Sequence, residues 1–349
     1  MQKLLASHKI DALLVQSPVN NFYFTHYPAS YAYVVITENG RSMYTDPRYY
    51  EEAKAFLTDT VVVSVKGAEA LAVIAKNLHS AGVKNLGYED DYLTVAQFKA
   101  FKKAFEGFTL KPASSLIHAL RLIKTPAQIA AIAAAQHLTE QVFEEVCDGL
   151  KPGVTEREVR ARLIIEALEA GADGAAFEPI VAFGENTAIP HHRASERRLE
   201  KEDIILIDFG VKLDGYCSDM TRTFCLNEPD DEKLAHLHEI VLGAQSYVLK
   251  HLKAGMTSRE ADSLAREYIR ANGYDAEFSH ALGHGIGLEI HESPKICEEN
   301  QDILLPGMVV TVEPGIYVSG VGGVRIEDTV VIREEGIENL TKAKKEFIL

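Results

Sequence analysis

The feature that most constrains the fold of this chain is an internal repeat in its C-terminal two thirds. The stretch Lys151-Pro-Gly-Val-Thr-Glu-Arg-Glu158 recurs 102 positions later as Lys253-Ala-Gly-Met-Thr-Ser-Arg-Glu260, and Gly171-Ala-Asp173 recurs at the same offset as Gly273-Tyr-Asp275. In each copy a threonine takes an expected helix N-cap, an acidic residue follows as in a capping box, and a glycine ends a helix of about 15 residues. The chain therefore builds one helix-containing unit twice.

Each copy also carries two carboxylates at matching places. An apolar run ends in Asp208 in the first copy and in Glu313 in the second, and Asp219 and Glu327 follow after turn-prone, glycine-containing stretches. These spacings predict two β-hairpins, in which residues on opposite strands share a face. Two copies of a helix–strand–hairpin unit facing each other across a pseudo-two-fold axis would bring the four acids to one central site.

A carboxylate at the end of an apolar run points into an interior, where an unpaired charge is expensive. Any one of the four acids is better explained as a solvated strand end or an ion-pair partner, but four in symmetric places favour a shared cation. The nearest basic residues, Arg222 and Arg325, do not balance four buried acids. An ion pair with Glu327 is a sufficient structural account of Arg325.

Histidines supply the second part of this pattern. Three of the chain's 13 histidines, His280, His284 and His291, lie within twelve residues between the two acid pairs. Glycines on both sides of His284 oppose a stable helix and allow its ring to be presented to a site. Imidazole with four carboxylates suits two divalent ions of the manganese, cobalt, iron or zinc type, which activate water for hydrolysis.

Histidines outside the ligand set can stabilise an oxyanion or pass a proton to a leaving group. His191 and His291 are the candidates for these roles. An exposed loop histidine is an equally good explanation of His191.

The first 110 residues have a different pattern, in which short β-rich runs alternate with helical stretches. Expected strands are Ala12–Gln16, Tyr33–Ile36, Ser42–Thr45 and Val61–Val65, and expected helices are Glu69–Ala81 and Val95–Lys103. Pro112 and a serine pair predict a linker over Lys111–Arg121, before an alanine-rich helix over Pro126–Leu150. We therefore predict an α/β (α+β) protein with domains 1–115 and 116–349.

Composition excludes several classes of protein. With 36 Lys and Arg against 51 Asp and Glu the net charge is −15, which argues against nucleic acid or an anionic membrane as a partner. The longest apolar runs have strand length, far below the roughly 20 residues of a membrane helix. The N-terminus has no signal-peptide pattern, and the four cysteines form no C-x-x-C pair, so we expect a cytoplasmic protein without a disulfide framework.

Five sequence blocks resemble the metal-binding blocks of the Xaa-Pro peptidases, prolidase and aminopeptidase P, within the creatinase and methionine aminopeptidase superfamily. The blocks are Ile-Asp208-Phe-Gly, Ser-Asp219-Met-Thr-Arg-Thr, Gly-His284-Gly-Ile-Gly-Leu-Glu-Ile-His291-Glu, Val-Glu313-Pro-Gly-Ile-Tyr and Gly-Gly-Val-Arg325-Ile-Glu327-Asp. The resemblance implies a C-terminal pita-bread fold with a dinuclear metal site, preceded by a smaller creatinase-type N-terminal domain.

The resemblance also implies a set of ligands. Asp208 matches a ligand of one ion, Asp219 and Glu327 match bridging ligands, and His284 and Glu313 match ligands of the other ion. Glu313 also matches the proton shuttle. Manganese is the expected metal, with cobalt, zinc or iron as alternatives.

Four further residues match positions around the substrate. His191 and His291 match histidines that contact the substrate and stabilise the intermediate, and His280 and Arg325 match positions close to it. Family members commonly dimerise, so the resemblance implies a homodimer.

The resemblance favours a Xaa-Pro dipeptidase (prolidase) acting on proline-containing dipeptides. The alternative is an aminopeptidase P that releases the residue before proline from longer or short peptides. A non-catalytic binding protein is a third possibility because the same fold occurs without activity, although all five ligand residues are present. A dipeptidase must bind the free carboxylate of proline, for which Lys295 is a candidate, although Lys295 is better explained as an ordinary solvated surface lysine. Phe177, Ile189 and Tyr216 are candidates to contact the proline ring.

Overall fold

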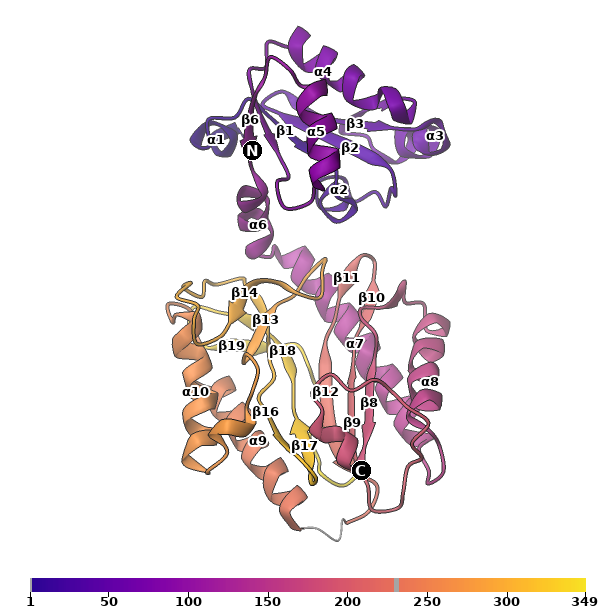
Figure 1. The fold of residues 1–349 in the computed structure, drawn as a ribbon, viewed down its shortest axis with the longest axis vertical. Helices are drawn as coiled ribbons and strands as arrows, with labels where there is room; N and C mark the ends of the chain where they lie inside the picture. The colour runs from indigo at the N-terminus through magenta and orange to yellow at the C-terminus, as the bar shows by residue number, and fades with distance from the viewer. Residues whose placement is uncertain (1, 229–231) are drawn as a thin grey trace. The chain divides into compact units, whose positions relative to one another are not determined.

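The computed structural model of the chain describes residues 2–228 and 232–349 (Figure 1). The chain forms two compact units, residues 1–120 and 121–349, and the division falls inside helix α6 (Ser114–Leu122). The predicted linker over Lys111–Arg121 is wrong, because this stretch holds the end of strand β6 (Thr109–Pro112) and most of α6. Pro112 is compatible with a strand since β6 lies at the edge of its sheet.

The first unit is a six-stranded mixed sheet with helices on both faces, in the strand order β4-β3-β2-β1-β5-β6. The other strands are β1 (Ala12–Val15), β2 (Ala32–Thr37), β3 (Gly40–Thr45), β4 (Thr60–Ser64) and β5 (Asn85–Tyr88). The helices are α1 (Gln2–Ser7), α2 (Pro18–Thr25), α3 (Pro47–Phe56), the 3₁₀ turn η1 (Gly67–Glu69), α4 (Ala70–Ser80) and α5 (Val95–Ala104). The predicted alternation of strands and helices is confirmed.

The alternation of side chains along β1 explains the two cores of this unit. Leu13 and Val15 pack with apolar residues of α1, α2, α3 and α6. Ala12 and Leu14 point to the other face and pack with α4 and α5. Because both faces of β1 are buried, its sequence is a continuous apolar run. The sequence therefore predicts this strand clearly.

The second unit contains the repeat. Thr155 caps α8 (Glu156–Glu169) and Thr257 caps α10 (Ser258–Ala271), each with the predicted capping box. Gly171 and Gly273 follow these helices with φ of 95° and 88°, in the left-handed region that glycine adopts without strain. The two helix signals predicted from the repeat are confirmed.

The remaining elements of the second unit are arranged around these two helices. The helices are α7 (Pro126–Asp148), α9 (Glu232–His251) and the 3₁₀ turns η2 (Gly184–Ala188) and η3 (Asp275–Glu277). The strands are β7 (Gly174–Ala175), β8 (Ile180–Phe183), β9 (Ile204–Phe209), β10 (Val211–Leu213), β11 (Tyr216–Cys217), β12 (Met220–Cys225), β13 (Gly283–Gly285), β14 (Glu292–Ile296), β15 (Val309–Val312), β16 (Gly315–Val318), β17 (Gly322–Arg325), β18 (Asp328–Ile332) and β19 (Ile337–Asn339). Figure 1 shows α7 and α8 on one side of this unit and α9 and α10 on the other, with strands between them.

Both predicted hairpins are present. β9 pairs with β12, and the chain turns between β10 and β11 through Asp214 and Gly215, which have φ of 48° and 81°. β15 pairs with β18, and β16 pairs with β17 around the glycine-rich turn. Positive φ at both central residues is the geometry of a type I′ turn, one of the two common two-residue hairpin turns.

In each hairpin one face packs against the helices, and the other face points away from them. In β9 the odd-numbered residues pack against α7 and α8, so Asp208 lies on the opposite face. In β15 the even-numbered residues pack against α9 and α10, so Thr311 and the following Glu313 lie opposite them. Strand periodicity therefore directs carboxylates of both copies away from the two helical layers.

None of the helices in the described part of the chain combines the length and the apolar character needed to cross a lipid bilayer. Cys217, Cys225 and Cys297 are buried and Cys147 is half-buried, and all four are free thiols.

Candidate metal centre

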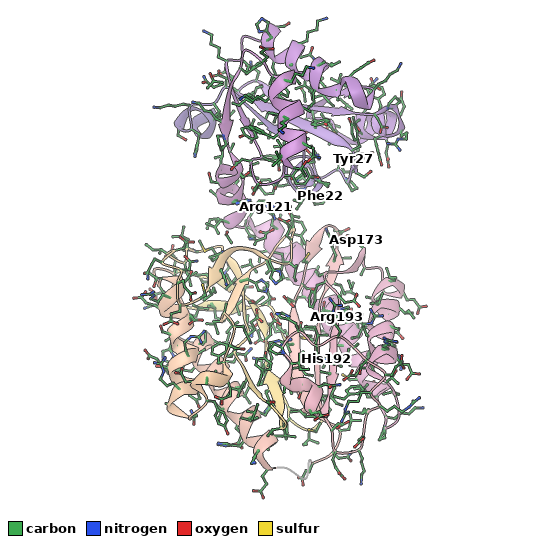
Figure 2. The ribbon with its side chains drawn as sticks, in the orientation of Figure 1. Phe22, Tyr27, Arg121, Asp173, His192 and Arg193 are labelled. Atoms are coloured by element: carbon green, nitrogen blue, oxygen red, sulfur yellow. The ribbon has the colours of Figure 1, made fainter. Side chains whose placement is uncertain are left out.

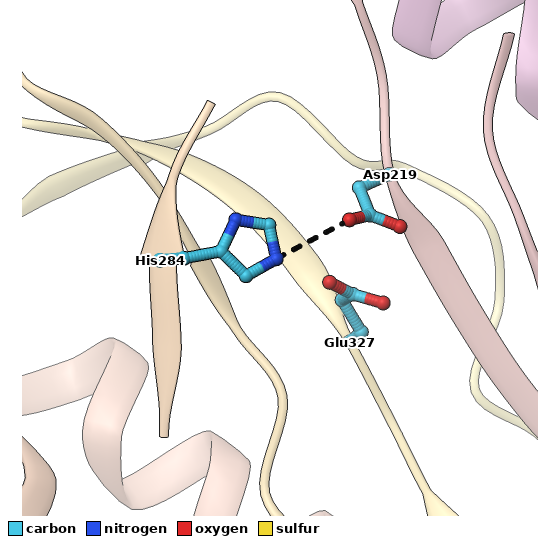
Figure 3. Close-up of side chains that lie close together, drawn as sticks. All are labelled: Asp219, His284 and Glu327. Atoms are coloured by element: carbon cyan, nitrogen blue, oxygen red, sulfur yellow. Dashed lines mark ion pairs between the residues drawn. The ribbon is translucent and has the colours of Figure 1, made fainter. Parts of the chain in front are cut away.

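The structure brings residues of both copies together at one buried place. One ligand atom each of Asp219, His284 and Glu327 lie within 4.8 Å of one another (Figure 3). Nε2 of His284 is 3.5 Å from a carboxylate oxygen of Asp219 and 3.4 Å from one of Glu313. Asp208 lies close enough to raise the pKa of Asp219.

The strand of His284 fixes the orientation of its ring. Its Nδ1 lies 3.1 Å from the carbonyl oxygen of Gly285, which fixes the hydrogen on Nδ1 and leaves the lone pair of Nε2 facing the acids. The flanking glycines permit close packing of the strand. A Cβ on Gly283 would lie 2.1 Å from the backbone oxygen of Thr311, and one on Gly285 would lie 2.2 Å from that of Ser293.

The buried oxygens of this site fit a bound cation. Asp208 Oδ1, Asp219 Oδ1 and Glu327 Oε1 are buried and have no hydrogen-bond partner among the described residues. Buried acceptors are normally paired, so each of these oxygens lacks a partner that a cation would supply. Carboxylates and an imidazole are the donor set of divalent ions such as Mn²⁺ and Zn²⁺.

The electrostatics lead to the same conclusion. Burial and the neighbouring carboxylates raise the pKa of Asp219 and of Glu327 well above their ordinary values. Burial also raises the pKa of Glu313, although His284 and Arg325 oppose the shift. A carboxylate cluster whose members resist ionisation in this way is stabilised in its charged form by a positive ion.

Arg325 corrects one expectation. Its guanidinium does not pair with Glu327 but donates to Asp208 Oδ2 at 2.6 Å. It is 3% exposed and also donates to the hydroxyls of Thr221 and Tyr317, at 3.1 and 2.7 Å. Arg325 therefore holds one carboxylate, and among the described residues no arginine or lysine pairs with the side chains of Asp219, Glu313 or Glu327.

The second nearby arginine serves another acid. Arg222 pairs with the buried Asp328 at 3.0 Å and donates to the backbone oxygen of Glu327 at 2.6 Å. It supports the backbone at Glu327, between β17 and β18, without neutralising the Glu327 carboxylate.

His280 is held neutral beside the centre. Nε2 accepts a hydrogen bond from the Tyr317 hydroxyl at 2.9 Å, and Nδ1 donates to the carbonyl oxygen of Ala281 at 2.8 Å. Burial and the charge of Arg325 lower the pKa of His280 to about 4. Its ring therefore stays uncharged near neutral pH.

The two candidate acid–base histidines are more accessible. The ring of His291 lies 4.3 Å from the ring of His284 in an edge-to-face arrangement. Desolvation and the nearby His284 and His191 lower the pKa of His291. His191 is exposed and lies close enough to influence both His280 and His291.

Sequence reasoning missed the residues that support the predicted ligands. Thr221 donates to Glu327 at 2.7 Å, Thr311 donates to Glu313 at 3.0 Å, and Tyr317 connects His280 to Arg325. The two threonines lie two positions from a predicted ligand on the same strand face, so strand periodicity could have identified them.

Comparison with known proteins extends over both units. Residues 1–123 match the Creatinase/Prolidase N-terminal domain, and residues 130–334 match metallopeptidase family M24. The chain is 37% identical to the Xaa-Pro dipeptidase of Pyrococcus furiosus over 99% of this chain and 97% of that protein.

Solved structures give the same picture. The Xaa-Pro dipeptidase from Bacillus anthracis superposes with a TM-score of 0.95 at 40% identity, over 99% of this chain and 97% of that chain. The X-Pro aminopeptidase from Thermotoga maritima superposes with a TM-score of 0.94 at 37% identity over the whole of both chains.

Proposed function

The chain belongs to metallopeptidase family M24, and from this premise we propose that it is a Xaa-Pro dipeptidase that hydrolyses dipeptides ending in proline. Its fold is that of a creatinase-type N-terminal domain followed by a pita-bread catalytic domain. The observation that carries the proposal is the convergence of His284, Asp219, Glu313 and Glu327 in a buried site, in a chain whose full length is similar to Xaa-Pro dipeptidases. We propose residues 116–349 as the catalytic domain, which begins five residues before the second compact unit.

We assign two divalent cations to this centre, with manganese as the first choice. Asp208 would bind one ion, His284 and Glu313 the other, and Asp219 and Glu327 would bind both. When bound, such ions lower the pKa of a shared water and polarise the scissile carbonyl, which is the chemistry of hydrolysis. The orphaned oxygens of Asp208, Asp219 and Glu327 support this ligand set.

The protein's own groups would then handle the protons. Glu313 lies beside His284 with a raised pKa, which suits a carboxylate that takes a proton from water and gives it to the departing proline nitrogen. His291, neutral because its pKa is lowered, would donate a hydrogen bond to the carbonyl oxygen as negative charge develops there. His191 would contact the substrate on the same side, since it lies near both His280 and His291. Arg325 would lie at the edge of the site because it binds Asp208. His280 would lie beside it because its ring binds the hydroxyl of Tyr317, to which Arg325 also donates.

Lys295 supports a preference for dipeptides. It is the cross-strand partner of His284 in the β13–β14 pair, so the two side chains lie on the same face. It is exposed, and its charge acts on the neighbouring Glu299, where it contributes to a lowered pKa. A lysine so placed can bind the carboxylate of a C-terminal proline.

The apolar candidates differ in their access to a proline ring. Ile189 is 53% exposed and lies two residues before His191, whereas Tyr216 is buried with 7% exposure. Ile189 is therefore the better candidate, and Phe177 is half-buried.

The test is a side-by-side assay on Ala-Pro and Ala-Pro-Ala, with protein stripped by a chelator and reloaded with manganese, cobalt or zinc. We expect metal-dependent cleavage of Ala-Pro alone. Efficient cleavage of Ala-Pro-Ala would favour the second candidate, an aminopeptidase P, which the similarity to the Thermotoga maritima X-Pro aminopeptidase supports. Inactivity on both peptides with every metal would overturn both.

A variant separates the two candidates further. Lys295→Met should raise the KM for Ala-Pro about tenfold, the effect of losing a charge-assisted hydrogen bond, while leaving the amide of Ala-Pro unaffected. Lys253→Met, at an exposed lysine in the repeat, makes the same charge change and is the matched control. Equal effects on the free acid and the amide would contradict recognition of the carboxylate.

Three further properties belong to the proposal. A homodimer rests on the family resemblance and is tested by light scattering. A cytoplasmic location is supported by four free thiols, which persist in a reducing compartment. A net charge of −15 supports peptides rather than nucleic acid or an anionic membrane as the partner.

A further inference from the structure

A buried carboxylate outside the metal centre fastens the segment between β8 and β9. Glu156, the first residue of α8, is fully buried and accepts five hydrogen bonds. Its Oε1 accepts from the backbone N–H of Phe183 and from Nδ2 of Asn186, both at 2.9 Å. Its Oε2 accepts from His192 Nε2 at 2.8 Å and from the backbone N–H and hydroxyl of Ser195 at 2.8 and 2.6 Å. One side chain thus ties together both ends of a 13-residue segment, 183–195.

The charge of Glu156 determines which ring nitrogen of His192 carries the hydrogen that faces it. Burial alone would raise the pKa of Glu156, but the hydrogen bonds from Asn186, Ser195 and His192 outweigh it and lower the pKa. An ionised carboxylate can only accept hydrogen bonds, so the hydrogen of His192 that faces it is on Nε2. The side chain of His192 (Figure 2) is 11% exposed.

The segment is held on both sides of His191. The carbonyl oxygen of Pro190 accepts from Nη1 of Arg325 at 3.3 Å, and the next residue but one is His192, bound to Glu156. Thr187, earlier in the segment, accepts from the backbone N–H of Gly323 at 2.8 Å. His191 is therefore an exposed ring on a backbone that is fixed at its immediate neighbours.

Helix capping does not explain Glu156. The cap of α8 is made by Thr155 and Glu158, whose backbone and side chains exchange hydrogen bonds. In the second copy of the repeat the position equivalent to Glu156 is Ser258, which contacts the backbone oxygen of Asp302. A buried carboxylate at this position is thus found only in the copy that carries His191.

We propose that Glu156 and His192 are positioning residues that hold the backbone at His191 so that its ring faces the substrate. The proposal rests on the proposed function, in which His191 contacts the substrate. A displacement of about 1 Å in a group that contacts the reacting centre can lower turnover about 100-fold, so fixing this backbone has a measurable effect.

The test compares variants at His192 that keep or remove its donor. His192→Phe keeps a ring and loses the hydrogen bond, and His192→Gln offers an amide N–H to the same carboxylate. We expect His192→Phe to lower kcat 10- to 100-fold with unchanged metal content, and His192→Gln to recover most of that loss. Glu158→Gln, which removes a negative charge from the same helical turn at an exposed site, is the matched control and should match the wild type.

A double-mutant cycle separates positioning from general support of the fold. In a His191→Ala background, His192→Phe should cause no further loss of kcat, because the group that it positions is gone. An equal fold-loss in both backgrounds, or wild-type turnover of His192→Phe, would overturn the proposal.

Hydrogen exchange provides a readout that does not depend on activity. His192→Phe and Glu156→Gln should speed amide exchange within residues 183–195 while leaving α8 protected, and Glu158→Gln should not. If the wild type fails to cleave Xaa-Pro peptides, the proposed function fails, and unchanged exchange in this segment would separately refute the role of Glu156 and His192.

Discussion

Removal of the cations from the metal centre should make the protein less stable as the pH rises. In the folded chain the pKa values of Asp219, Glu313 and Glu327 are raised, with burial as the largest cause. Above about pH 4 the unfolded chain releases these protons, whereas the folded chain keeps them up to its own higher pKa values. The folded state then binds more protons than the unfolded state, so the free energy of unfolding falls with pH across this window.

The magnitude follows from the number of protons retained. Each proton contributes a slope of about 1.4 kcal/mol per pH unit, so three carboxyl groups give at most about 4 kcal/mol per pH unit. Bound cations replace these protons, so the free energy of unfolding of the loaded protein lacks this dependence on pH. Two buried histidines act in the opposite direction, because burial lowers the pKa of His238 and His280 to about 4 and stability rises from there to about pH 6.5. Neither is a proposed ligand, so their contribution cancels in the difference between loaded and stripped protein.

The assay is urea unfolding followed by circular dichroism at pH 5, 6, 7 and 8, for stripped and for manganese-loaded protein. The stability difference between the two forms should grow with pH by about 1.4 kcal/mol per unit for each displaced proton. Asp219→Asn, which lacks one of the carboxyl groups, should lose one such increment from the slope of the stripped form. A stability difference that does not change with pH would refute the reasoning.

Three further predictions concern single residues. His291→Ala should keep the bound metal, measured by mass spectrometry, and lower kcat at least tenfold, since it removes a donor to the reacting carbonyl; lost metal would identify His291 as a ligand. The hydroxyl of Thr257 accepts a hydrogen bond from the backbone nitrogen of Glu260 at 3.1 Å and caps α10. Thr257→Ala removes this cap and should lower the free energy of unfolding by about 1 kcal/mol in urea titrations. An unchanged urea midpoint would contradict this. Arg222→Met removes the guanidinium from the buried Asp328, which keeps Lys345 as a second cationic partner, and should cost about 2 kcal/mol in the same assay, so a loss below about 1 kcal/mol would show the pair to be unimportant.

The parts of the fold that could be predicted are those coded by short-range patterns. Thr155 with Glu158, and Asp214 with Gly215, form a cap and a turn from residues within four positions of each other, so the sequence contains the whole interaction. The linker prediction is wrong because a proline is compatible with a strand at a sheet edge, and the edge position of β6 depends on a strand order that Pro112 and its neighbours do not encode.

The parts of the site that could not be predicted depend on side chains far apart in the chain. Arg325 lies two residues from Glu327 but pairs with Asp208, which is 117 positions away. Residues two positions apart share a face only within a strand, but β17 ends at Arg325 and Glu327 lies between β17 and β18. Proximity in sequence therefore gave the wrong partner. Glu156 was missed because an acidic residue in the first turn of a helix is common and is usually solvated.

The distribution of the proposed ligands over the repeat has a consequence for assembly of the second unit. Asp208 and Asp219 come from the first copy, and His284, Glu313 and Glu327 from the second. A bound cation is thus a non-covalent cross-link between two halves of one polypeptide, and its binding free energy adds directly to their mutual affinity. A fragment that contains only one copy should bind the metal weakly, whereas two separately expressed halves should be recruited to each other when the metal is added.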